Sequence, residues 1–470
     1  MTQMFSHFIL RILASKIKAN GMFAVMVDGT QDICGSEQES VCIRHVDSEL
    51  CVHEDFLGLY KMQQTTGDAI ARMILDVLTR FSLSAGQIRA QTYDGASNMS
   101  GKYNGCQAVI SSQYPLATYF HCQSHLANLV MQESITSCPF FRDAVQWVHE
   151  LGVLFKRSGK FKVVFESVVA CSTELINTKA SIRPLCPTRW LCRLSAILSV
   201  LENYSAVTES LRSMSEGSTD SATKANALLN RFEKTETFLA LYLVKKPIAL
   251  LEQLNSSMQA SSSNLSGSIE AVATTAKQIQ VFRDPIMYTN LFDETTKISA
   301  NLGLDEISVP RRRQPTPRFA GSSPHFHAKC AKDHYRLLYV EFIDCLLGCL
   351  QKRYDVRNSS FQTYLEIENM IMKGTATNLD LISKYPELNV TQLSVQLPMF
   401  KQHTGASSVN EAKLAYRAMS SELRQLFTQV FILLKLLLVC PVSSCECERS
   451  FSTLRRLKTW LRSTTIPRFA

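Results

Sequence analysis

The sequence has little of several features that would place it in a familiar class. Its most apolar run, Val430 to Cys440, is short for a membrane span and contains Lys435. This run is therefore expected to be a buried core helix or strand. No secretory signal precedes the cysteines, and no fixed-period repeat is evident. These features argue against a membrane protein, a secreted disulfide scaffold and a repeat protein.

The excess of charge of one sign is also small. The net charge of +9 over 470 residues is a small excess, although it leans towards a polyanionic partner. Hydrophobic residues make up 46% of the chain, which is ordinary for a globular protein with room for two or three domains. The fifteen cysteines are an odd number and are scattered, which favours reduced thiols in an intracellular compartment.

The first part of the chain has the pattern of a mixed α/β domain. The segment FSHFILRILASKI reads as an amphipathic helix, although its basic character also resembles a mitochondrial presequence. Apolar and β-branched runs then predict five strands, over residues 22–28, 39–47, 51–60, 88–94 and 116–122. Helices are expected over residues 68–83 and 104–114. The first three strands follow each other directly, so the sheet should begin antiparallel.

Two aspartates stand at the carboxyl ends of predicted strands. Asp28 ends the run MFAVMVD, and Asp94 ends IRAQTYD before a turn rich in Gly, Ser and Asn. If the first and fourth strands are neighbours, the two carboxylates repel each other, and Mg²⁺ or Mn²⁺ would relieve that repulsion. The alternative is that each Asp caps a loop or helix. The turn after Asp94 lacks the Lys and the spacing of a phosphate-binding P-loop.

A third carboxylate, Glu448, lies on a predicted helix in SSCECERSFSTLRR. Glu446 is two residues away and cannot share its helical face. Glu448 is thus a candidate third metal ligand, and the alternative is a surface ion pair with a nearby Arg. The residues after Glu448 are basic, as is the run Arg311-Arg312-Arg313. Such runs bind phosphates or nuclear import factors, or form solvated surface.

Two residue pairs could contact nucleic acid. Cys122 and His125 form a C-x-x-H at the start of a predicted helix, without the second pair that a structural zinc site needs. They could order the site, touch phosphate, or be a buried thiol and a satisfied imidazole. Arg189-Trp190 follows Pro187 in a chain with three Trp. A Trp can stack on an unpaired base beside a phosphate-binding Arg, or it can be a core residue with a snorkelling Arg.

In their order along the chain, these motifs resemble the hAT family of transposases, in the branch of zinc-finger MYM-type and TTF-type domain proteins. The motifs are VDGTQD with EQESVCIRHVD, TYDGASNMSG, HCQSHLANL, CPTRW and PVSSCECERSFSTLRRLKTWLRST. The resemblance runs over most of the chain. It is most specific at the last motif, which is similar to the family's C-terminal dimerisation segment.

The resemblance implies an α/β fold, an RNase H-like mixed sheet with a large all-helical insertion domain. Residues 1–160 would form the first part of the core, with five strands and their helices. Residues 161–426 would form the helical insertion with Ser/Pro-rich loops. Residues 427–470 would return to the core and carry a shortened dimerisation segment.

The resemblance also implies roles for individual residues. Asp28, Asp94 and Glu448 match a catalytic triad that binds Mg²⁺ or Mn²⁺. DNA contacts are implied at Cys122, His125, Arg189 and Trp190. The last of these matches the Trp that steadies a flipped base at the cut DNA end.

The resemblance further implies a nuclear protein that binds DNA, such as transposon ends in relatives, and self-associates through its C-terminal segment. A membrane and a small-molecule substrate are not expected. Relatives carry a zinc finger before the position of Met1, and their dimerisation segment continues where this chain reads TTIPRFA, so the chain resembles a member truncated at both ends. We therefore expect a domesticated or decayed element with nucleic-acid binding and dimerisation activity. The alternatives are an active DNA cleavage and strand-transfer transposase and a non-catalytic protein-interaction platform.

Overall fold

The structure falls into two compact units, each described by itself. The first unit comprises residues 1–126, 257–271 and 354–470, and the second comprises residues 127–256 and 272–353. The computed structural model describes residues 2–171, 182, 192–260, 263–310, 330–355 and 359–457.

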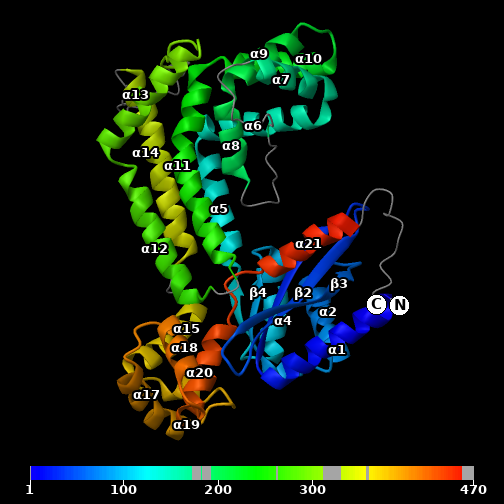
Figure 1. Ribbon diagram of the computed structural model, residues 1–470, viewed down its shortest axis with the longest axis vertical. Helices are drawn as coiled ribbons and strands as arrows, with labels where there is room; N and C mark the ends of the chain where they lie inside the picture. Colours follow the sequence, from blue (N-terminus) through cyan, green and yellow to red (C-terminus); the bar gives the residue numbers. More distant parts are fainter. Residues whose placement is uncertain are drawn as a thin grey trace, which may run out of the picture. The chain divides into compact units, whose positions relative to one another are not determined.

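The first unit is built on a five-stranded sheet with the order β3-β2-β1-β4-β5 (Figure 1). Its strands are β1 (Phe23–Gln31), β2 (Glu37–Val46), β3 (Val52–Lys61), β4 (Ile88–Tyr93) and β5 (Thr118–His121). The pairs β1–β2 and β2–β3 are antiparallel, whereas β1–β4 and β4–β5 are parallel. The predicted α/β fold with an antiparallel start is confirmed, and its first and fourth strands are neighbours.

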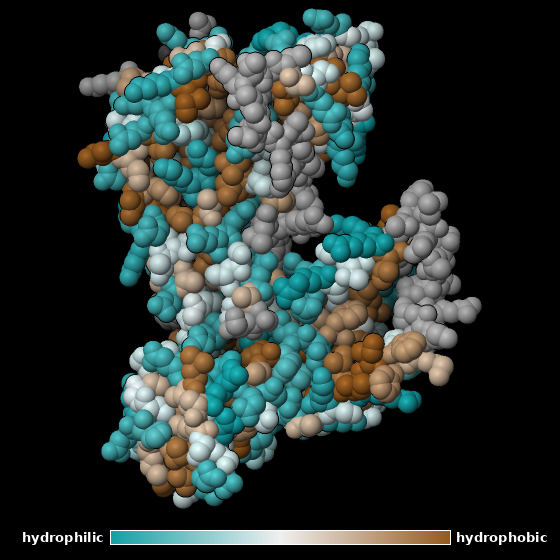
Figure 2. Space-filling model, in the orientation of Figure 1, coloured by the Kyte–Doolittle hydropathy of each residue, from teal (hydrophilic) through white to brown (hydrophobic). Residues whose placement is uncertain are grey.

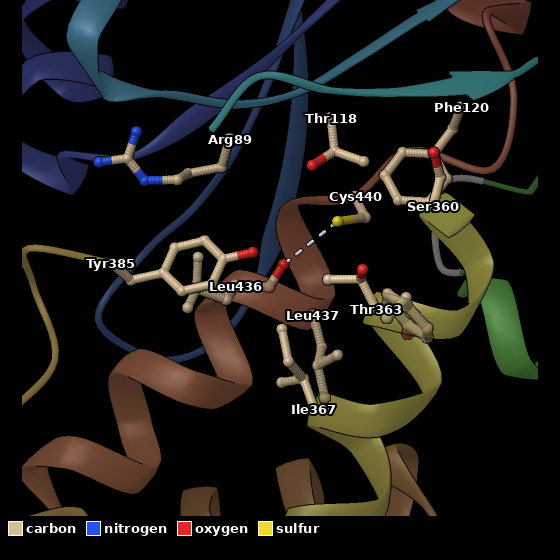
Figure 3. Close-up of a pocket in the computed structure, with 11 residues that line it drawn as sticks. Arg89, Thr118, Phe120, Ser360, Thr363, Ile367, Tyr385, Leu436, Leu437 and Cys440 are labelled. Atoms are coloured by element: carbon tan, nitrogen blue, oxygen red, sulfur yellow. Dashed lines mark hydrogen bonds between the residues drawn. The ribbon is translucent and has the colours of Figure 1, made fainter. Parts of the chain in front are cut away.

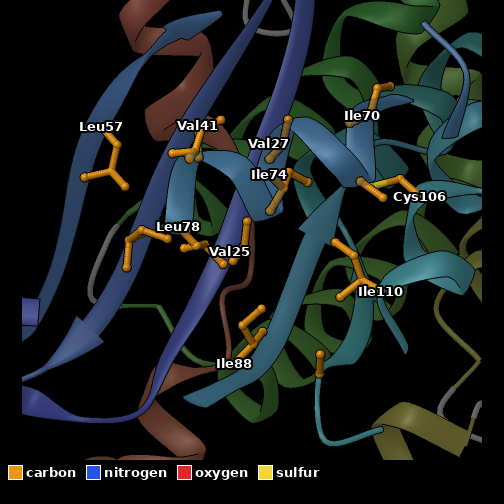
Figure 4. Close-up of a cluster of buried hydrophobic side chains, with 14 of the residues drawn as sticks. Val25, Val27, Val41, Leu57, Ile70, Ile74, Leu78, Ile88, Cys106 and Ile110 are labelled. Carbon is orange, nitrogen blue, oxygen red and sulfur yellow. The ribbon is translucent and has the colours of Figure 1, made fainter. Parts of the chain in front are cut away.

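One face of this sheet forms the main hydrophobic core of the first unit (Figure 4). Val25 and Val27 of β1 and Val41 of β2 point to this face, because alternate residues of a strand share a side. They pack against α2 (Gly67–Arg80) and α4 (Cys106–Gln113), which supply Ile74 and Ile110. The strand residues in between, such as those of β1 and β2 that pack on Cys447, belong to the opposite face.

The helices of the first unit come from two stretches of the chain, residues 1–126 and 354–470. They are α1 (Thr2–Asn20), α2, α3 (Ser97–Ser100), α4, α15 (Ser359–Lys373), α16 (Leu379–Ile382), α17 (Val390–Thr404), α18 (Val409–Ala418), α19 (Ser421–Leu426), α20 (Thr428–Val439) and α21 (Cys445–Leu457), with a 3₁₀ turn η1 (Ala85–Gln87). The apolar run before the last turn is the buried helix α20, and its Lys435 donates to the carbonyl of Asn20 at 2.7 Å. The N-terminal helix α1 keeps apolar side chains on its outer side, where hydrophobic atoms gather in Figure 2.

The second unit is helical throughout its described residues, which agrees with the expected all-helical domain. Its helices are α5 (Gln123–Ser137), α6 (Pro139–Arg157), α7 (Gly159–Cys171), α8 (Arg193–Glu202), α9 (Tyr204–Ser215), α10 (Asp220–Phe232), α11 (Thr235–Met258), α12 (Leu265–Val281), α13 (Pro285–Asn301) and α14 (Ala331–Arg353), of which α5, α11 and α12 also reach into the first unit. Aromatic residues fill its interior: the rings of Phe141 and Phe342 lie 4.8 Å apart, and the Tyr204 hydroxyl donates to the carbonyl of Phe232 at 2.8 Å.

The boundaries of the two compact units differ from those expected from the sequence, which were residues 160 and 426. Residues 127–160 belong to the second unit, and residues 354–426 belong to the first. The difference arises because α15 packs against α17 and α20 and reaches β5, so these helices extend the core of the sheet unit. None of the described helices is long and apolar enough to cross a membrane.

Candidate metal and nucleic-acid site

Asp28 and Asp94 lie at matching positions where β1 and β4 separate. The parallel pairing of these strands ends at Met26 and Thr92, and each aspartate follows two residues later on the same face of its strand. The predicted neighbourhood of the two carboxylates is therefore present. β1 was expected to end at Asp28, but it continues to residue 31 because its antiparallel pairing with β2 runs on, with Asp28 opposite Ser40.

Helix α21 brings Glu448 to the same face of the sheet. The thiol of Cys447 donates to the carbonyl of Met26 at 3.3 Å. The Ser450 hydroxyl lies 2.8 Å from the hydroxyl of the β2 residue that pairs with Asp28. These two contacts flank Glu448 along the helix and hold it beside the end of β1.

The start of α21 is anchored by the junction between β5 and α5. The backbone amide of Ser444 donates to the sulfur of Cys122 at 3.4 Å, and the amide of Gln123 donates to the carbonyl of Val442 at 2.9 Å. Cys122 is fully buried, and burial raises the pKa of its thiol to about 12. A neutral, enclosed thiol fits the interpretation of Cys122 as a residue that orders the site.

His125 lies in a row of aromatic rings behind Asp94. The rings of His121 and His125 are stacked with centroids 5.8 Å apart, and Tyr119 follows at 6.5 Å from His121. The Tyr119 hydroxyl donates to the backbone carbonyl of Asp94 at 3.2 Å. Gly95 is required here, because a Cβ at this position would lie 2.5 Å from the His121 ring. The glycine after Asp94 thus leaves room for the His121 ring. His125, which stacks on His121, is partly exposed.

Burial and neighbouring negative charge raise the proton affinity of Asp28. The pKa of Asp28 lies well above its ordinary value because the group is buried and because Glu448, Asp94 and Glu39 add negative charge. Burial also raises the pKa of Glu448 to about 8, although the adjacent Arg449 opposes this effect. The site therefore concentrates acidic groups in a place where their charged forms are costly.

The fourth acid, Glu39 on β2, was not anticipated from the sequence. It is 4% exposed, and burial together with the charges of Asp94 and Glu37 raises its pKa to about 7. Its motif, EQES, places Glu37 and Glu39 on one face of a strand and gives no sign that this face turns towards the site. Only the strand register, which places Glu39 opposite Gly29, reveals it.

The donor chemistry of this cluster fits Mg²⁺ or Mn²⁺. Carboxylate oxygens are the hard donors that these ions prefer, and Oε2 of Glu39 is buried without a hydrogen-bond partner. Among the described residues, no three His, Cys, Asp or Glu side chains already form an arrangement that could hold a metal ion. Cation binding would therefore require the carboxylates of Asp28, Asp94 and Glu448 to move closer together.

Some of the predicted nucleic-acid contacts lie outside the described residues. These are Arg189, Trp190 and the basic run 311–313. Within the described part, Arg455 and Arg456 are exposed in the last turn of α21, the helix that carries Glu448.

An exposed aromatic residue lies further along the turn that starts at Asp94. Tyr103 is 82% exposed, and the ammonium group of Lys102 lies 5.9 Å from its ring centroid. An aromatic ring beside a cation is a combination that binds unpaired bases. Sequence reasoning missed this pair, although its position between Gly101 and Gly105 in GKYNG marks an exposed turn.

A small cavity in the first unit is separate from the carboxylates (Figure 3). It lies between the strands and helices α15 and α20, with Arg89 and Thr118 on the strand side. Arg89 is at the start of β4, whereas Asp94 follows its end. The sulfur of Cys440 donates to the carbonyl of Leu436 at 3.3 Å inside it. The cavity is thus at the opposite end of the strand from the candidate site.

Comparison with known protein families gives matches at both ends of the chain. Residues 1–105 match the family described as "ZMYM1/FAM200, RNase-like domain". Residues 419–466 match the "hAT family C-terminal dimerisation region". These segments carry Asp28, Asp94 and Glu448, the three carboxylates that the fold brings together.

Two curated relatives align along nearly the whole chain. The chain is 20% identical to the mouse "52 kDa repressor of the inhibitor of the protein kinase", over 96% of this chain and 61% of the relative. It is 19% identical to the human protein of the same name, over 96% of this chain and 60% of the relative. The chain thus spans about three fifths of the length of the curated relatives it matches.

The RNase-like sheet, the helical domain and the C-terminal dimerisation region together define a transposase-like protein. Within that class, the family matches and the relatives support a protein derived from a hAT transposase. The resemblance and the fold class inferred from the sequence are confirmed.

Proposed function

We propose that this domesticated transposase-like protein binds DNA, and that Asp28, Asp94 and Glu448 hold Mg²⁺ or Mn²⁺ at the DNA backbone. The supporting observation is that three acids from distant parts of the chain meet at one end of the sheet, where the charges of Asp94 and Glu448 raise the pKa of Asp28. Unrelieved repulsion of this kind destabilises the fold, and a divalent cation would offset it.

The chemistry of such a site follows from its parts. A bound Mg²⁺ or Mn²⁺ supplies Lewis-acid stabilisation of phosphodiester oxygens. The chain holds Glu448 in place through the anchored start of α21. Burial raises the pKa of Glu448 to about 8, so cation binding at this carboxyl is coupled to release of its proton and should strengthen as pH rises. His125 offers an imidazole at the rim for contact with phosphate.

The DNA contacts would come from exposed basic and aromatic side chains. Arg455 and Arg456 lie on the helix of Glu448, and Lys102 and Tyr103 lie beyond the Asp94 turn. Phosphate contacts make binding weaken as salt rises, with a slope close to the number of phosphates neutralised.

Fluorescence anisotropy with labelled duplex and single-stranded DNA, at several salt concentrations, tests DNA binding. The Arg455→Ala/Arg456→Ala variant should weaken binding and reduce the log–log salt slope by about one to two. Arg72→Ala/Arg80→Ala is a matched control, since both arginines are exposed on α2 and paired within it. Absence of any salt-dependent binding would favour a protein-interaction platform instead.

DNA cleavage and strand transfer form the second candidate function, favoured by the presence of all three carboxylates. The protein would be incubated with Mg²⁺ or Mn²⁺ and DNA that carries candidate terminal repeats. Metal-dependent products that disappear in Asp94→Ala would support this activity. Equal products from both proteins would refute it, while leaving DNA binding intact.

We also propose self-association through the dimerisation region and residence in the nucleus. Residues 419–466 match a family region named for dimerisation. The nuclear location is proposed because a protein that binds DNA is expected with chromatin. Analytical ultracentrifugation of the full chain and of a chain ending at residue 418 tests the first proposal, with a monomer in both cases as the contrary result. Fluorescence microscopy of a tagged chain tests the second.

A further inference from the structure

Two cysteines of the second unit lie one turn apart on α14. Cys345 and Cys349 are four residues apart in this helix, so their side chains share one of its faces. Their sulfur atoms are 4.0 Å apart. Cys349 is 6% exposed and Cys345 is half-buried, so solvent reaches the pair from the Cys345 side. Two thiols this close can bind a soft metal ion or form a disulfide.

The geometry of the helix disfavours the disulfide. The Cβ atoms of helical residues four apart are about 5–6 Å from each other, whereas a disulfide needs about 3.5–4.5 Å. An ion placed between the two sulfur atoms does not require them to touch. Two metal–sulfur bonds of about 2.3 Å each span at most about 4.6 Å. The separation of 4.0 Å between the sulfur atoms therefore admits one bridging ion.

The number of ligands selects the kind of ion. Among the described residues, no third His, Cys, Asp or Glu joins the two thiols in an arrangement that could hold a metal. Zinc takes about four ligands in structural sites, so two thiols are too few for it. Cu(I) prefers thiolate sulfur, and two thiolates in line satisfy its single charge. The pair of thiols therefore fits Cu(I).

The surroundings of the pair can balance the charge of such a complex. Burial, together with Cys345 and Glu133, raises the pKa of the Cys349 thiol to about 11. Binding of Cu(I) releases one proton from each thiol to water and leaves one net negative charge on the ion and its two thiolates. Arg353 lies one turn further along the same face, and its buried Nε has no hydrogen-bond partner in the part of the chain that the structure describes. This cation, which pairs with Glu133 of α5, offsets the negative charge.

We propose that Cys345 and Cys349 bind one Cu(I) ion between two turns of α14. The site shares no residue with the carboxylates of the first unit, and it uses soft sulfur donors in place of hard oxygen donors. The copper stays cuprous, because binding exchanges protons for the ion without electron transfer. The bound ion cross-links two turns and should stabilise α14, since it binds the folded helix in preference to the unfolded chain.

Competition for Cu(I) with the colorimetric chelator bathocuproine disulfonate tests the site in the full chain, without oxygen and with a phosphine reductant. The unaltered protein should hold one ion. Cys345→Ser and Cys349→Ser should each weaken its binding by about 100-fold or more, because the two thiols act together as a chelate. Cys330→Ser is the matched control, since it removes an exposed thiol just before the same helix, and it should leave the affinity unchanged.

Copper X-ray absorption of the one-to-one complex measures the ligand count directly. Two sulfur neighbours, with slower amide hydrogen exchange in the α14 peptides, would support the proposal. Circular dichroism checks that the variants keep their helices, and the half-buried Cys345→Ser decides the test if Cys349→Ser does not fold.

Three results would overturn the proposal. The first is unchanged Cu(I) affinity in the folded serine variants, and the second is a count other than two sulfur neighbours. The third is one Zn²⁺ ion held as tightly as Cu(I) and lost in the same variants, which would refute the assignment to Cu(I).

Discussion

In the absence of a cation, Glu39 should make the sheet unit less stable as pH rises, and Glu39→Gln should remove that effect. Its pKa is about 7 in the folded protein, against an ordinary value of 4.5. The folded state therefore holds the proton more tightly than the unfolded state. Stability is fully present below about pH 4.5 and falls until about pH 7, because the unfolded chain ionises first.

The size of the effect follows from the shift. At about 1.4 kcal/mol per pH unit, the difference between the two pKa values corresponds to about 3 kcal/mol, of which about 2.5 kcal/mol falls between pH 5 and pH 8. Gln has nearly the shape of protonated Glu and carries no charge. Glu39→Gln should thus resemble the unaltered protein near pH 4.5 and exceed its stability by about 2–3 kcal/mol at pH 8.

Amide hydrogen exchange of the β1 and β2 peptides measures this stability in the unit that contains Glu39. Both proteins would be compared in EDTA at pH 5, 6, 7 and 8, and the ratio of their exchange rates at each pH cancels the intrinsic pH dependence. The ratio should widen steadily towards pH 8. A constant ratio across this range would refute the reasoning, because it would mean that Glu39 titrates alike in the folded and unfolded states.

Three further changes probe the contacts that shape the site. Gly95→Ala should cost about 1–3 kcal/mol of unfolding free energy, because its Cβ would meet the His121 ring; Gly86→Ala, with 3.5 Å of room, should have little effect in the same thermal unfolding assay. Glu54→Gln should cost about 3–5 kcal/mol because it leaves the buried Arg44 without its carboxylate, whereas Glu49→Gln removes a surface pair worth under about 1 kcal/mol. Cys122→Ala should cost about 1–3 kcal/mol of unfolding free energy, because it leaves the Ser444 amide without its acceptor. It should also speed amide hydrogen exchange at the start of α21. Unchanged exchange there would contradict the anchoring role.

The sequence predicted those parts of the site that depend on local pattern. A continuous apolar run indicated β1, and β-forming residues before Asp94 indicated β4. The acids that end these two segments indicated neighbouring carboxylates. The run before the last turn was correctly read as a buried segment, and it is α20. Family resemblance, rather than spacing, connected Glu448 to the two aspartates.

The remaining features depend on pairings between distant segments, which no local pattern encodes. Glu39 turns towards the site only because β2 pairs with β1 in one register, and a shift of one residue would have turned Glu37 and Glu39 to the other face. The sulfur of Cys122 accepts from an amide 322 residues away. The assignment of residues 354–426 to the sheet unit likewise follows from helix packing, which the Ser/Pro-rich breaks between helices do not reveal.

The contact between Cys447 and Met26 joins residues that are 421 positions apart. Because a chain leaves the ribosome from its N-terminus, the strands that carry the two aspartates are made well before the acidic helix that completes the site. A partly synthesised or prematurely ended chain therefore presents two aspartates without Glu448. The order of synthesis thus delays assembly of the three-carboxylate site until α21 has been made.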